Sequence, residues 1–154
     1  MNTKILKTTS ESEIVSTRIF NAPISIVFRA WSEPEHLKNW WGPAGFTNTF
    51  EEFDFREGGR WRFIMHGPEK GNYANDCEFI KISEPTLIAW KRYSQPLFQV
   101  VATFEEIAQD QTTLVFKMLF ETVELCQKIK PHVVDKNEEN FDKLEFELIK
   151  MQRE

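Results

Sequence analysis

The sequence has little cysteine and lacks a long hydrophobic run. Cys77 and Cys126 have neither a CxxC spacing nor a histidine cluster beside them. A disulfide framework or a zinc site is therefore not indicated, and we expect both cysteines to be small buried or half-buried residues. Residues 1–12 form a polar lead without a hydrophobic signal region. We expect neither secretion nor a membrane span, which makes the cytoplasm the expected location.

Positive charge is also scarce in this chain. Its 154 residues include 24 acidic and 19 basic side chains, a formal charge of −5. This balance argues against a nucleic-acid partner. The length suits one domain with its own core, which we assign to residues 13–151. The aromatic content is unusual, with 14 Phe, 5 Trp and 2 Tyr, so large flat side chains must build the interior.

Hydrophobic periodicity predicts an α+β order of elements. Residues 13–20 have the pattern of a strand, and residues 23–31 that of a helix with one apolar stripe. Ser32 and Glu35 have the spacing of a capping box, which predicts a short second helix ending at the Gly-Pro turn of NWWGPAGF. An antiparallel meander of six strands follows, at residues 46–55, 60–66, 72–82, 86–92, 98–107 and 112–120.

Helical spacing returns after residue 121. Residues 122–130 predict a short helix that ends before Pro131, and Asp135 with Glu138 predicts the start of a longer helix to residue 151. Its apolar stripe consists of Phe141, Leu144, Leu148 and Met151 and also includes Asn137. A sheet with one apolar face needs a cover, and a twisted sheet around one helix leaves a cavity.

The turn NWWGPAGF places Trp40 and Trp41 where the backbone stops being regular. The two side chains either plug the end of the core or line the cavity. Two other apolar residues, Phe146 and Ile149, lie off the stripe of the terminal helix. Either the N-terminal strand and early helices cover them, or they form a small exposed patch that would support a symmetric homodimer.

Several segments together resemble the START-like, helix-grip (Bet v-like) superfamily. The segments are APISIVFRAWSEPEHLKNWWGP, FDFREGGRWRFIMHGPEKG, EFIKISEPTLIAW, ATFEE and ENFDKLEFEL. Within the superfamily they are similar to the branch named after the C-terminal domain of the activator of heat shock protein 90 ATPase, over about residues 13–150. The resemblance implies a curved antiparallel sheet around a long C-terminal helix, with a hydrophobic cavity. The superfamily includes lipid carriers, hormone receptors, aromatase/cyclases and co-chaperone domains.

The sequence departs from this branch in two places. Its GPEKG turn is longer than the GPDG turn that is common in relatives, which changes a hairpin tip and not the chemistry. The chain also matches only the second domain of the two-domain activator. Stimulation of a chaperone ATPase is thus a property of the family name, and not one that these residues show.

The function that we expect is binding of a hydrophobic small molecule, lipid-like or aromatic, without a metal or cofactor. At these periodicities aromatic residues also build filled cores, so the packing between sheet and helix decides between the two interpretations. The side chains expected to line the cavity are Trp31, Trp41, Trp61, Phe63, Met65, Tyr73, Phe79, Trp90, Phe116, Met118, Phe141, Leu144 and Leu148.

Two alternatives stay open at this point. A co-chaperone-like domain would bind a chaperone ATPase through its surface, as the family name implies. An enzyme of the cyclase or hydrolase kind would use Tyr73, Glu78 or His66 as acid or base inside the cavity. We expect His36 on an exposed helix turn. Neither His36, His66 nor His132 has a nucleophile or carboxylate at a motif spacing, so a catalytic triad or metal site is not indicated.

Charged residues surround the EGG turn and have two interpretations. They form a salt-bridged outer face of the sheet, which contributes little stability, or they anchor the polar head group of a ligand. These residues are Asp54, Arg56, Glu57, Arg60 and Arg62.

Overall fold

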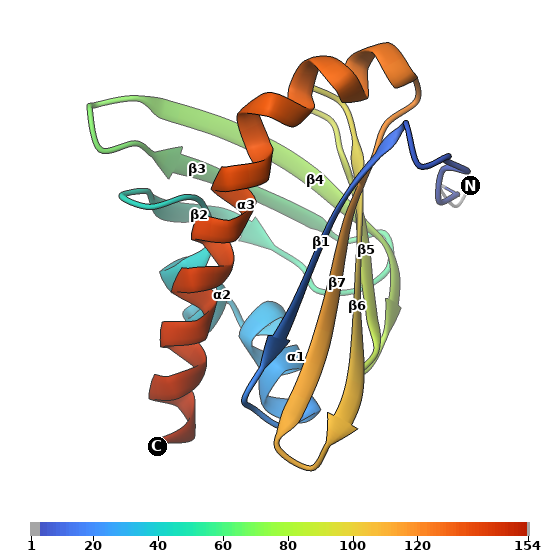
Figure 1. Ribbon diagram of the computed structural model, residues 1–154. Coiled ribbons are helices and arrows are strands. Elements are labelled where there is room, and N and C mark those ends of the chain that lie inside the picture. Colours follow the sequence, from blue (N-terminus) through green and yellow to red (C-terminus); the bar gives the residue numbers. More distant parts are fainter. Residues whose placement is uncertain (1–3, 154) are drawn as a thin grey trace.

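The computed structural model describes residues 4–153 and shows an α+β fold in which one curved sheet grips a long helix (Figure 1). Within this range, seven antiparallel strands form one sheet in the order β1-β7-β6-β5-β4-β3-β2. The predicted N-terminal strand and six-stranded meander are confirmed, with ends that agree to within two residues. The strands are β1 Glu13–Phe20, β2 Thr47–Phe53, β3 Arg60–His66, β4 Asn72–Ser83, β5 Leu87–Arg92, β6 Gln99–Ala108 and β7 Gln111–Leu119.

Two short helices, α1 (Ile24–Ser32) and α2 (Pro34–Trp40), connect β1 to β2. Both were predicted, but the capping box was wrong. Ser32 is the last residue of α1, and Glu33 is the N-cap of α2 without a side-chain hydrogen bond. Pro34 suits the first turn because it has no N–H group that needs a cap.

The C-terminal helix α3 (Val123–Gln152) is continuous, so the prediction of two separate helices was wrong. Its first turn is capped by the Thr122 hydroxyl, which accepts a hydrogen bond from the Leu125 N–H at 3.1 Å. Figure 1 shows that α3 changes direction between its orange first part and its red second part. Pro131 lies inside the helix. A proline that removes one backbone hydrogen bond bends a well-packed helix without ending it.

The inner, concave face of the sheet is apolar and the outer face is polar. On β3, Trp61 and Phe63 are buried whereas Arg60 and Arg62 point outward, as the period of two predicts. Phe79 lies opposite Trp90 in the β4–β5 register, and both are buried. Each fully buried aromatic side chain contributes about 1.5–3 kcal/mol of transfer free energy. The buried aromatic side chains therefore contribute substantially to the stability of the fold.

Other expectations concern the cysteines, the N-terminal lead and membranes. Cys77 and Cys126 are free and buried, as predicted. The described part of the lead is tied to β6, because the Gln99 side chain accepts from the Leu6 N–H at 2.8 Å and donates to the Lys4 carbonyl at 3.0 Å. No helix within residues 4–153 is long and apolar enough to span a membrane.

Candidate ligand-binding cavity

A cavity of about 580 Å³ lies between the inner face of the sheet and the first half of α3. This volume is in the range of small-molecule sites. Exposed side chains of Tyr73, His132 and Lys136 stand at its rim. The apolar and aromatic wall consists of Trp41, Phe46, Phe63, Met65, Trp90, Phe98, Val100, Phe116, Met118, Ile129 and Val133.

The structure divides the residues that sequence reasoning assigned to the cavity into two groups. Seven of them line it: Trp41, Phe63, Met65, Tyr73, Trp90, Phe116 and Met118. The other six pack in the buried core outside the cavity lining: Trp31, Trp61, Phe79, Phe141, Leu144 and Leu148. Contact with a ligand stays a prediction for the first group.

The second group is buried because α1 and α2 fill the concave face opposite the C-terminal half of α3. Trp31 of α1 contacts the rings of Trp40 and Phe104 at centroid distances of 4.8 and 5.4 Å. Leu144, at 0% exposure, is fully packed. The cavity was expected next to Leu144 and Leu148. It lies instead beside Ile129 and Val133, in the first half of α3.

The neighbouring tryptophans of the NWWGPAGF turn have different roles. Trp40 is completely buried, and its indole N–H donates to the Ala30 carbonyl at 3.0 Å. Trp41 follows the end of α2 in an extended conformation and lies half-buried on the cavity wall. Its ring contacts those of Trp61 and Trp90 at centroid distances of 5.2 and 5.6 Å. One tryptophan plugs the core and the other lines the cavity, because the helix ends between them.

The loop after Trp41 is held against α3 by side chains that sequence reasoning did not identify. The Asn140 side-chain oxygen accepts a hydrogen bond from the Gly42 N–H at 3.1 Å. The Lys143 ammonium donates to the carbonyls of Pro43 and Phe46 at 3.3 and 3.0 Å, and burial lowers the pKa of this lysine. These bonds fix the loop that carries Trp41. The available signal was the i, i+3 spacing of Asn140 and Lys143.

Arg92 and Asn75 are polar residues on the inner face at the cavity. Arg92 lies opposite Cys77 in the β4–β5 register and follows Trp90 at the strand period. Its guanidinium donates to the Asn75 side-chain oxygen and to the carbonyls of Gln95 and Pro96, the latter two at 3.0 Å. Burial lowers the pKa of Arg92. Sequence reasoning missed it, although its spacing from Trp90 was the signal.

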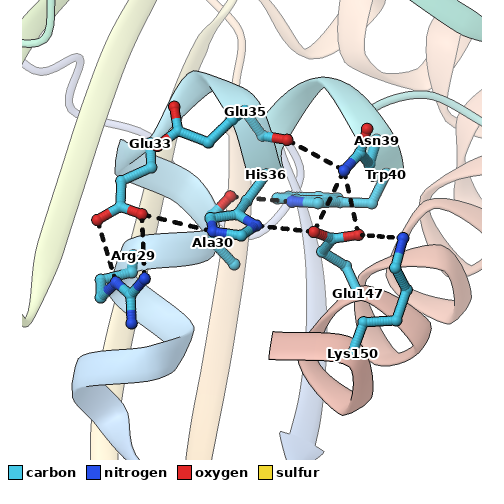
Figure 2. Close-up of polar contacts among 9 residues, drawn as sticks. All are labelled: Arg29, Ala30, Glu33, Glu35, His36, Asn39, Trp40, Glu147 and Lys150. Atoms are coloured by element: carbon cyan, nitrogen blue, oxygen red, sulfur yellow. Dashed lines mark hydrogen bonds and ion pairs between the residues drawn. The ribbon is translucent and has the colours of Figure 1, made fainter. Parts of the chain in front are cut away.

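A separate polar cluster joins α2 to the C-terminal half of α3 (Figure 2). The Glu147 carboxylate is only 5% exposed and lies 2.8 Å from His36 Nδ1. The Asn39 amide donates to both carboxylate oxygens, and Lys150 lies 3.5 Å away. His36 was expected on an exposed turn, and that expectation was wrong, because α2 packs this side chain against α3. The cluster is not part of the cavity lining; its role is to hold the helices together.

The proposed acid and base residues do not converge in the cavity. Glu78 lies on the outer face, where it accepts a hydrogen bond from the Tyr93 hydroxyl at 2.9 Å, because its neighbour Cys77 occupies the inner position. His66 contacts neighbouring side chains in exposed hydrogen bonds. Tyr73 is 55% exposed at the rim. The acid–base arrangement predicted for a cyclase or hydrolase was therefore wrong.

The charged residues around the EGG turn form the outer, salt-bridged face. Their arginines pair with carboxylates at N–O distances of 2.8–3.9 Å. None of the five lines the cavity: Asp54, Arg56, Glu57, Arg60 and Arg62. Among residues 4–153, no group of three or more His, Cys, Asp or Glu side chains is arranged to hold a metal ion.

Two exposed apolar side chains lie on the outside of α3. Phe146 is 71% and Ile149 42% exposed. The early elements do not cover these side chains, so the exposed alternative is the one that the structure shows. The homodimer that such a patch would support stays a prediction.

Comparison with known proteins agrees with this architecture. No curated protein matches the sequence. A structure from Nitrosomonas europaea has a TM-score of 0.87 at 19% identity and covers 96% of this chain and 100% of its own. A structure from Mycobacterium smegmatis has a TM-score of 0.82 at 22% identity and covers 98% of this chain and 99% of its own. The structure of the AHSA1 protein from Silicibacter pomeroyi has a TM-score of 0.72 at 18% identity and covers 89% of this chain and 97% of its own. At such low identities the likeness shows the fold alone, and it confirms the predicted helix-grip fold.

The family is shown by the sequence itself. Residues 21–148 match the family described as Activator of Hsp90 ATPase homolog 1-like protein. The match spans α1 to the packed half of α3 and includes both walls of the cavity. The chain therefore belongs to the Activator of Hsp90 ATPase homolog 1-like family.

Proposed function

We propose that this protein binds a hydrophobic small molecule, lipid-like or aromatic, in the cavity between the sheet and the first half of α3. The observation that supports it is a volume of about 580 Å³ with mostly apolar walls. Protein interiors are packed as densely as organic crystals. A chain that closes the rest of its core with aromatic side chains and leaves this space open has the shape of a binding protein.

The walls suit a flat or elongated apolar body. Trp41 and Phe116 face the space from the loop and the sheet, and Val133 faces it from α3. A ligand between these surfaces would remove apolar area from water on both partners, at about 25 cal/mol per Å² of buried area. The exposed rim at Tyr73 gives a path of entry.

A pair of neighbouring α3 residues provides the test. Val133 lines the cavity, whereas Val134 is 38% exposed and is not part of the lining. Binding of Nile red, an uncharged apolar dye, is titrated by fluorescence with wild type, Val133→Trp and Val134→Trp. The indole of Val133→Trp fills the space, so we expect dye binding to be lost in this variant and kept in Val134→Trp. Equal binding by both variants would place the dye elsewhere and contradict the proposal.

Contact with a chaperone ATPase stays a prediction that the family description alone supports. Its test is capture of the purified ATPase by the immobilised protein, with ATP hydrolysis measured beside it. No capture and no change in hydrolysis would reject this partner.

A further inference from the structure

The charge of the cavity differs in sign from that of the whole protein. The chain has a net charge of −5, yet none of the residues that line the cavity is an aspartate or a glutamate. The charged side chains of the lining are Arg92 on the inner wall and Lys136 at the rim. An acidic protein that keeps its carboxylates out of a cavity and places cations there has a site complementary to an anion.

Arg92 has no carboxylate partner. Within residues 4–153 no carboxylate lies within ion-pair distance of its guanidinium, whose acceptors are one amide oxygen and two carbonyls. These three hydrogen bonds use three of the five guanidinium N–H groups. Removing a charge from water without an opposite charge is costly. Two N–H groups of the guanidinium remain without an acceptor among these three, and Arg92 lines the cavity.

A second inward-facing arginine provides the comparison. Arg18 lies on the inner face of β1 and is 19% exposed, but it pairs with Glu138 and Asp142 of α3, both at 2.8 Å. Arg18 is therefore paired with carboxylates of the chain, whereas Arg92 is not. The difference is the expected one if the partner of Arg92 comes from outside the chain.

We propose that the ligand of the cavity carries a carboxylate that pairs with Arg92, while its apolar body lies between Trp41, Phe116 and α3. This inference rests on the proposed function and adds the chemical class of the ligand. A planar guanidinium matches a carboxylate with two parallel hydrogen bonds. Neutral contacts from Asn75, Gln95 and Pro96 hold the guanidinium in place without neutralising it. At the rim, the positive charge of Lys136 favours the approach of an anion.

The test compares two probes that differ only in the head group, decanoate and 1-decanol. Each displaces Nile red from wild type, Arg92→Met, Arg92→Lys and Arg62→Met, in low salt. Arg62→Met is the matched control, because it removes the same charge from the outer face. Nile red binding itself reports whether the cavity of each variant is intact.

We expect wild type to bind decanoate about tenfold or more tightly than decanol, as hydrogen bonds to a charged group predict. In Arg92→Met the decanoate affinity should fall by about the same factor, whereas the affinities for decanol and Nile red should change much less. Arg62→Met should behave as wild type. Arg92→Lys keeps the charge but not the paired geometry, so it should keep part of the preference.

The outcomes separate the two proposals. Equal affinity of wild type for decanoate and decanol, or an unchanged preference in Arg92→Met, overturns the assignment of a carboxylate and leaves the apolar site standing. If Arg92→Met loses all dye binding, Arg92→Lys and wild type in high salt provide the test instead. A preference for decanoate over decanol that does not weaken in these two measurements overturns the assignment. If wild type binds neither Nile red nor either probe, the proposed function itself fails.

Discussion

The two halves of α3 face the same sheet but pack differently. The C-terminal half is closed against α1, α2 and the sheet, with Phe141, Leu144 and Leu148 buried. The first half crosses the open part of the sheet, and Ile129 and Val133 border the cavity. The difference arises from α1 and α2, which fill only one end of the concave face. A single helix can therefore serve as core at one end and as the wall of a binding site at the other.

The largest expected effect compares one deletion in each half. Leu144→Ala leaves a hole in close-packed surroundings and should lower the free energy of unfolding by about 2–5 kcal/mol. Val133→Ala removes atoms that already border open space, so its cost should be about 1 kcal/mol or less. Urea unfolding of both variants measures the difference. Equal costs would show that the two halves are packed alike.

The polar cluster of the packed half gives the next effect. His36→Ala removes the closest partner of the buried Glu147 carboxylate, which should cost about 1–3 kcal/mol of stability. Nile red affinity should not change, because the cluster is outside the cavity lining. His66→Ala is the control, since its hydrogen bonds are exposed. A loss of dye binding in His36→Ala would show that the two halves are coupled.

Gly42 lies at the boundary between the halves and should give a smaller effect. Its φ of +100° disfavours any side chain, and an added Cβ would lie 2.8 Å from the Met65 methyl group on the cavity wall. Gly58 has a φ of +85° but no atom within 4 Å of the added Cβ. Both alanine variants should therefore lose about 1 kcal/mol from the backbone, as measured by thermal unfolding.

The contact with Met65 separates these variants. Gly42→Ala alone should lose further stability and weaken Nile red binding, because the methionine must move. Identical stability and dye binding of the two variants would remove the link between this turn and the cavity.

The smallest effect is on reactivity. Burial raises the pKa of the Cys77 thiol to about 12, so the thiolate that reacts with iodoacetamide is scarce at pH 9. Alkylation in the folded protein should be many times slower than in urea, as followed by mass spectrometry of the Cys77 peptide. Because the pKa is raised in the folded state, stability should decline as the pH rises above the ordinary thiol pKa of about 8.5. Rapid alkylation of the folded protein would contradict this burial.

The sequence predicted most of the fold because local periodicity encodes it. Alternation in RWRFIMH placed Trp61 and Phe63 inward, and the stripe of the last helix placed Phe141 and Leu144 on the sheet. The proline rule failed at Pro131 because tertiary packing outweighed the loss of one backbone hydrogen bond.

The site was less predictable because it depends on contacts between distant residues. The sequence shows that Trp41 and Leu144 are apolar. It does not show that α1 and α2 fill the space beside Leu144 and leave the space beside Trp41 open. His36 and Glu147 are 111 positions apart, so no motif relates them. Arg92 ends β5 after four apolar residues and Lys91, and this charged strand end was overlooked.

A crystal structure of the complex with Nile red tests the central claim most directly. We expect electron density for the dye between Trp41, Phe116 and Val133, with Leu144 packed as in the free protein. Density at another surface, or an unoccupied cavity in crystals with saturating dye, would contradict it.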